Sequence, residues 1–187
     1  IGLSLRHGGV YETRGDSVNA SQIALINAAK THIDSRAQSN LFSAQALTIW
    51  KETLRIVMAS IKQWINPLTS LDDIWIKEVE FAYPAGDNSN REAPQKGPGL
   101  ILQFADTELS IRPIWFKVGG APTAPLIAYG VVELFGHGMK EPVEIKYLNG
   151  TFEKIVNSSV DAPFGELTFG GCLVNAIGDL KPQTSAR

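Results

Sequence analysis

Apolar positions between residues 47 and 64 recur every three or four residues, which is the repeat of an α-helix. Six large side chains share this stripe: Leu47, Trp50, Leu54, Val57, Ile61 and Trp64. Pro67 follows, and proline cannot donate the backbone hydrogen bond that a helix interior requires. We therefore predict a helix over about residues 43–65 that buries this stripe against a core.

A shorter helical pattern precedes this stripe. Capping-type residues between Asp16 and Ser21 lead into further positions at helical spacing, namely Ile23, Ile26, Ala29, His32 and Ile33. The pattern predicts a first helix over about residues 19–37, with a break near Ser39 and Asn40. Before it, alternating residues around Gly8-Gly9 predict two short strands joined by a tight turn.

After residue 73 the pattern changes to two-residue alternation interrupted by glycine and proline, which is typical of strands. It predicts strands near residues 75–83, 100–104, 109–115, 126–135, 143–147 and 152–156. Residues 126–135 are almost continuously apolar, which indicates a central strand buried on both faces. Asn149-Gly150 suits the positive φ angles of a type I′ hairpin turn.

Other segments are less regular. Residues 84–98 have almost no large apolar side chain and predict an exposed loop. Pro113 cannot donate to a strand ladder, so its strand is expected at the edge of the sheet. Residues 167–169 could form a last strand, and residues 172–177 a strand or a short helix.

Together these patterns predict a single α+β domain over residues 1–187. An N-terminal hairpin (residues 1–17) and two helices (18–66) pack on a mainly antiparallel sheet of five to seven strands (73–180). The chain has 187 residues, 44% of them hydrophobic, which suits one domain with one core.

Charge and cysteine content exclude several classes of protein. The net charge of −2 carries no broad positive field for nucleic acid, and no apolar run is long enough to span a bilayer. One cysteine, Cys172, excludes a disulfide-stapled scaffold. The single cysteine and the lack of a signal-peptide pattern favour the cytoplasm.

Candidate catalytic residues are few. Gly170-Gly171 precedes Cys172, and His137 is the base that could activate its thiol. The alternative interpretation is a buried structural cysteine and a histidine in a glycine-rich turn, and we favour it because the spacing matches no nucleophile motif.

No metal or cofactor site is predicted. The three histidines lack partners at ligand spacing, and residues 87–98 depart from a calcium loop at the sixth and twelfth positions. Arg14-Gly15-Asp16 is a short match of the kind expected by chance, and three Asn-X-Ser/Thr sequences would be glycosylation acceptors only if the chain enters a secretory pathway. A basic row on the second helix, Lys51, Arg55 and Lys62, could contact phosphates but more commonly marks a solvated face.

The sequence therefore predicts binding in place of catalysis. We expect a non-enzymatic interaction or assembly protein, for example an immunity or adaptor protein or a subunit of a larger particle, that binds a protein partner or itself. The candidate binding residues are an aromatic pair and part of the polar loop: Trp115, Phe116, Asp87, Asn88, Asn90 and Arg91. The alternative is a small-molecule-binding or hydrolase-like domain with a site near His137 and Cys172.

Overall fold

The computed structural model describes residues 20–87, 94–120 and 125–182. The chain divides into two compact units, Ile1–Gln38 and Ser39–Arg187, and each is described by itself below. The strands predicted in residues 1–14 and the Arg14-Gly15-Asp16 tripeptide lie outside the described residues. The expectation of a single domain stays a prediction.

Helix α1 (Ala20–Ile65) is continuous, so the break predicted near Ser39 and Asn40 is wrong. Serine and asparagine each cost a helix only about 0.5 kcal/mol relative to alanine, too little to end a helix without glycine or proline. The predicted end is confirmed, because α1 passes into the short 3-10 helix η1 (Asn66–Ser70), which has Pro67 in its first turn.

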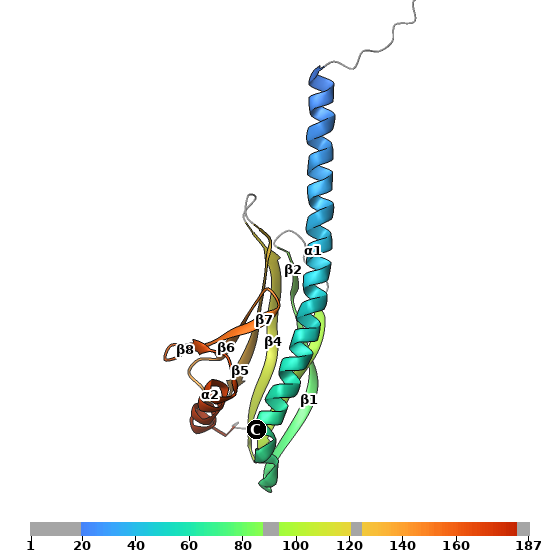
Figure 1. The fold of residues 1–187 in the computed structure, drawn as a ribbon. Helices are drawn as coiled ribbons and strands as arrows, with labels where there is room; N and C mark the ends of the chain where they lie inside the picture. Colours follow the sequence, from blue (N-terminus) through green and yellow to red (C-terminus); the bar gives the residue numbers. More distant parts are fainter. Residues whose placement is uncertain (1–19, 88–93, 121–124, 183–187) are drawn as a thin grey trace, which may run out of the picture. The chain divides into compact units, whose positions relative to one another are not determined.

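One mainly antiparallel sheet makes up most of the second unit. Its strands are β1 (Ile74–Tyr83), β2 (Ala85–Asp87), β3 (Gln95–Phe104), β4 (Thr107–Gly119), β5 (Ile127–Gly136), β6 (Val143–Leu148), β7 (Thr151–Val156) and β8 (Asp161–Pro163). They follow the order β1-β3-β4-β5-β6-β7-β8, and β2 pairs in parallel with β4 (Figure 1). The α+β class is confirmed, with eight strands among the described residues where five to seven were predicted.

Two of the three local predictions for β5 and its neighbours are confirmed. Strand β5 is the middle strand of the sheet order, as its apolar run indicated. The predicted burial on both faces is wrong, because Tyr129 and Phe135 are exposed on the face away from the helices. The β6–β7 hairpin turns at Asn149 and Gly150, whose φ angles are 45° and 109°. These positive values explain why asparagine and glycine occupy the turn.

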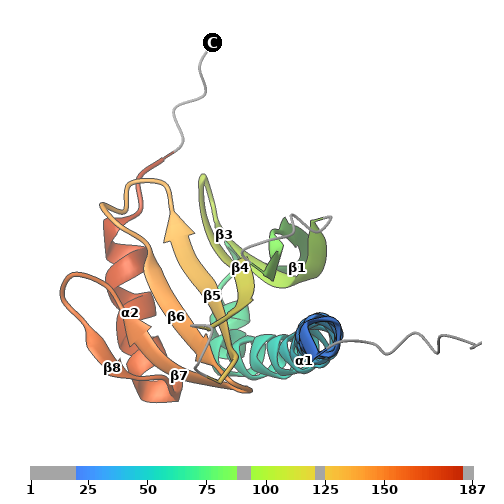
Figure 2. The same cartoon turned by 90° about the horizontal axis from the view of Figure 1, so that it is seen from above.

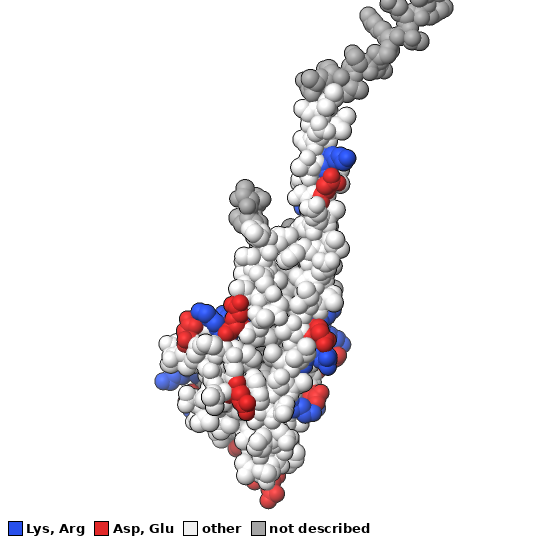
Figure 3. Space-filling model, viewed as in Figure 1, with Lys and Arg blue, Asp and Glu red and all other residues white. Residues whose placement is uncertain are grey.

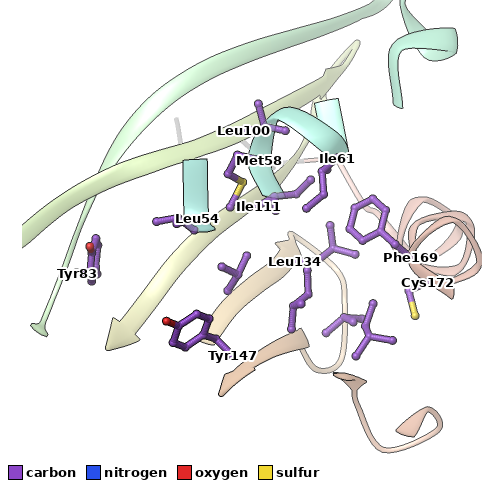
Figure 4. Close-up of a cluster of buried hydrophobic side chains, with 14 of the residues drawn as sticks. Leu54, Met58, Ile61, Tyr83, Leu100, Ile111, Leu134, Tyr147, Phe169 and Cys172 are labelled. Carbon is purple, nitrogen blue, oxygen red and sulfur yellow. The ribbon is translucent and has the colours of Figure 1, made fainter. Parts of the chain in front are cut away.

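Both helices of this unit cover the same face of the sheet. A Cβ atom on Gly130 of β5 would meet the Trp50 ring of α1, and one on Gly136 would meet Leu180, just after α2 (Glu166–Asp179). Because 130 and 136 have the same parity on β5, both point to one face. Figure 2 shows α1 and α2 against the sheet, and Figure 4 shows side chains of both in one apolar cluster.

The apolar stripe of the long helix packs on this face, as predicted. Trp50, Leu54 and Ile61 are fully buried, and Leu47, Val57 and Trp64 are partly buried against the same cluster. The helix therefore contributes the ridge around which the sheet is built.

Three sequence predictions about the sheet are corrected. Residues 167–169 belong to helix α2 and not to a strand. Residues 172–177, predicted as a strand or a short helix, belong to the same helix. Strand β3 begins at Gln95, so the predicted loop 84–98 is interrupted by β2 and by the start of β3. Pro98 is accommodated there because β4 pairs with β3 only from Leu100 onward.

Pro113 does not lie on an edge strand, because β4 lies between β3 and β5. The β4–β5 register shifts between Pro113 and Trp115. Pairing of β4 with β3 ends at Ile111, so β3 requires no ladder hydrogen bond from Pro113, and an interior strand can tolerate the proline here.

Candidate functional site

The two aromatic residues predicted to bind a partner follow the bulge in β4 and point to opposite faces of the sheet, as consecutive strand residues do. Phe116 is buried, and its ring stacks on that of Trp50 at 5.4 Å between centroids, so its predicted place on a binding surface is wrong. Trp115 is half-buried, and the Lys117 ammonium lies 5.6 Å from its ring centroid. Of this pair, Trp115 alone remains available as a surface contact.

Of the polar loop residues predicted to bind a partner, the structure describes only the backbone of Asp87. The backbone of Asp87 ends strand β2 and pairs with Val118 of β4. Its side chain lies outside the described part of the structure, as do Asn88, Asn90 and Arg91. Their role in binding stays a prediction.

The structure places Cys172 and His137 in different surroundings. Cys172 lies on the inner face of α2 among the buried apolar side chains (Figure 4). His137 is exposed in the turn after β5, where its carbonyl accepts a hydrogen bond from the Lys181 amide at 2.9 Å. No hydrogen bond between the two side chains occurs in the described structure.

A cavity of about 620 Å³ lies beside α2, between that helix and the turns flanking β6 and β7. Cys172 is one of its lining residues, together with polar groups that include Glu141, Ser158 and Asn175, whereas His137 is not. The Glu141 carboxylate accepts hydrogen bonds from both the amide and the hydroxyl of Ser158. His137, the base predicted to activate the thiol, is not part of this cavity.

Burial raises the pKa of the Cys172 thiol, because the thiolate would lose its hydration. We therefore expect Cys172 to react with a disulfide reagent such as DTNB at pH 8 at least about 100-fold more slowly than a small free thiol. Unfolding in guanidinium should restore the full rate. Rapid reaction in the native protein would contradict the buried, neutral thiol.

The basic row on α1 is balanced by neighbouring groups. Arg55 pairs with Glu52 at 2.8 Å, Lys62 pairs with Glu78 of β1, and Lys51 donates to the Gln95 side chain at 2.7 Å. Arg55 and Lys62 also line a 460 Å³ groove between α1 and strands β1 and β3. Because two of its three cations are paired with carboxylates, this row does not form an extended positive surface. Figure 3 shows acidic and basic groups interspersed on the visible face.

Neither a metal-binding cluster nor a membrane-spanning helix occurs in the described part of the chain. Among the described residues, no group of three or more histidine, cysteine, aspartate or glutamate side chains could hold a metal ion. No described helix combines the length and apolar character required to cross a lipid bilayer.

The most unusual surface belongs to the first unit. Every side chain described there, from Ile23 to Gln38, is exposed. The exposed fractions are 50% for Ile23, 71% for Leu25, 59% for Ile26 and 65% for Ile33. Large apolar side chains left together on the surface are typical of an interaction site.

We call the exposed large apolar side chains of this surface the α1 seam: Ile23, Leu25, Ile26 and Ile33. The helical spacing of its isoleucines is visible in the sequence, where it was interpreted as a helix without a binding role.

No protein-family model matches the chain, and comparison with curated proteins and with solved structures finds no match. Its function is therefore inferred from the chain's own surfaces.

Proposed function

We propose that this protein is a non-enzymatic assembly protein that binds a protein partner through the α1 seam. The observation that carries the proposal is the exposure of Ile23, Ile26 and Ile33 on a helical segment whose described side chains are all exposed. Isolated helices of fewer than about 15 residues are marginal in water, and most helices depend on tertiary packing of an apolar face.

The free energy available from covering these side chains is substantial. Fully burying an isoleucine contributes about 1.5–3 kcal/mol, so three that are at least half exposed can contribute a few kcal/mol when a partner covers them. Covering the seam would stabilise the helix and the complex together.

The hydrolase-like alternative has less support. The Cys172 thiol is buried with a raised pKa, and His137 does not line the cavity beside it. The pairing of these two residues that the alternative requires is therefore not supported.

Site-specific photocrosslinking tests the proposal. A photoreactive residue at position 33 of the full chain, in cells that produce it, should form a discrete crosslinked product with a defined protein. Ile56 supplies the matched control, since it is an isoleucine on the same helix with 52% exposure and lies outside the seam.

We expect the product at position 33 to exceed that at position 56 by at least about fivefold, and to fall when Ile26→Ser is added, because the substitution removes apolar contact area. Equal crosslinking at both positions would contradict a specific partner at the seam.

A further inference from the structure

We infer that Asn149 is a modification site controlled by the fold: its side chain deamidates when the β6–β7 turn separates from β5, and the closed turn prevents the reaction. The inference is independent of the α1 seam. It depends on the residue that follows Asn149, on two hydrogen bonds at the turn, and on the packing behind the turn.

The chemistry requires only two residues and water. The backbone nitrogen of Gly150 attacks Cγ of Asn149 and forms a C–N bond, and its proton leaves with the side-chain nitrogen as ammonia. Water then opens the resulting succinimide, which leaves aspartate or isoaspartate at position 149. Glycine has no Cβ atom to hinder the attack, and Asn149 is the one asparagine in the sequence that precedes a glycine.

Two hydrogen bonds hold Asn149 in place while the turn is closed. The Ala128 backbone amide donates to Oδ1 of Asn149 at 2.9 Å, and the Asn149 amide donates to the Ala128 carbonyl at 3.0 Å. Forming the succinimide ring rotates the Asn149 carboxamide onto the Gly150 nitrogen, which breaks the bond between Ala128 and Oδ1. The reaction therefore requires local opening of the turn.

Helix α1 supports the closed turn from behind. The rings of Tyr147 and Phe152, which flank the turn, lie 4.8 and 5.5 Å from the ring of Trp50, measured between centroids. A Cβ atom on Gly150 would lie 3.9 Å from Ile49 of the same helix. Weakening this packing should therefore increase the rate of deamidation.

The two products differ in whether the turn can close again. Asn149 is exposed, so water reaches the succinimide. Aspartate keeps an oxygen that can accept the hydrogen bond from Ala128. Isoaspartate adds a methylene group to the backbone, which no longer fits a two-residue hairpin turn. Isoaspartate at this position therefore makes opening of the turn irreversible.

Peptide mapping by mass spectrometry tests the protection. The purified full chain is kept at pH 8, either native or in guanidinium, and aspartate and isoaspartate are measured at each asparagine. We expect Asn149 to deamidate at least about tenfold faster in the unfolded chain than in the native chain. In the unfolded chain it should react at least about fivefold faster than Asn157, which precedes a serine.

Trp50→Ala tests the contribution of α1. We expect deamidation of Asn149 in the native chain to increase by at least about fivefold, because the ring that supports Tyr147 and Phe152 is absent. Phe152→Ala should act in the same direction and replaces Trp50→Ala if that variant does not fold. Trp75→Ala is the matched control, since Trp75 is exposed on β1, and should change the rate less than about twofold.

Thermal unfolding tests the difference between the products. The chain with isoaspartate at position 149, separated after refolding, should unfold at least about 3 °C below the unmodified chain. Asn149→Asp should stay within about 2 °C of it, because the acceptor for Ala128 is retained. Equal shifts for the two would contradict an irreversible opening.

Three further results would overturn the inference. Equal rates in the native and the unfolded chain would show that the closed turn does not protect Asn149. An unfolded rate no higher than that of Asn157 would exclude Asn149 as a preferred site. Unchanged rates in folded Trp50→Ala and Phe152→Ala would contradict the support from α1.

Discussion

Replacing Trp50 with alanine is expected to lower the free energy of unfolding by about 3–5 kcal/mol. Trp50 is fully buried on α1, and the rings of Tyr83, Phe116, Tyr147 and Phe152 lie between 4.8 and 6.1 Å from its own, measured between centroids. Removing the indole leaves a large cavity at the centre of this aromatic cluster, because the surrounding strands are held by their ladders.

The substitution also removes a hydrogen bond. The indole Nε1–H donates to the Tyr83 hydroxyl at 3.0 Å, and burial raises the pKa of that hydroxyl. Without the indole the buried hydroxyl loses its donor, which adds to the cost. Trp50→Phe keeps most of the ring volume, so it should cost less than Trp50→Ala and separate the two effects.

Urea or guanidinium unfolding followed by circular dichroism measures this prediction. Trp75→Ala is the matched control, because Trp75 on β1 is 58% exposed and should cost less than about 1 kcal/mol. Equal losses in the two variants would mean that Trp50 does not organise the core.

Replacing Gly130 with alanine is expected to lower the free energy of unfolding by about 1–3 kcal/mol through overpacking. A Cβ atom at this position would lie 2.5 Å from the Trp50 ring, closer than van der Waals contact permits. The ring is confined by its aromatic neighbours, so the strand or the helix would have to move.

Gly171 provides the opposite case. It lies in α2, where an added Cβ atom would meet nothing within 4 Å, and glycine disfavours a helix by about 1 kcal/mol relative to alanine. Gly171→Ala should therefore raise the free energy of unfolding by about 0.5–1 kcal/mol. A stabilising Gly130→Ala would contradict the close approach of α1 to β5.

A double variant tests the physical cause. If the cost of Gly130→Ala comes from the Trp50 ring, it should largely disappear in the Trp50→Ala background, where the ring is absent. The two effects would then be strongly non-additive, as expected for residues in contact. If the free-energy losses of the two substitutions simply add, the cost of Gly130→Ala does not come from contact with the Trp50 ring.

Periodicity alone identified much of this architecture. The stripe from Leu47 to Trp64 predicted the helix that packs on the sheet, since one face of a helix must be apolar to be buried. The Asn149-Gly150 turn and the central position of β5 were also determined locally, by φ preference and by continuous hydrophobicity. These features depend on residues close together in the sequence.

Tertiary structure decided what local patterns could not. Pro113 is compatible with an edge strand or with a bulge, and only the pairing of β4 with both neighbours distinguishes them. That bulge also sends Phe116 into the core and leaves Trp115 outside, because one extra residue reverses the parity of every side chain that follows it. The exposure of Ile26 and Ile33 likewise depends on what packs against them, since an apolar stripe has the same spacing whether it faces a core or a partner.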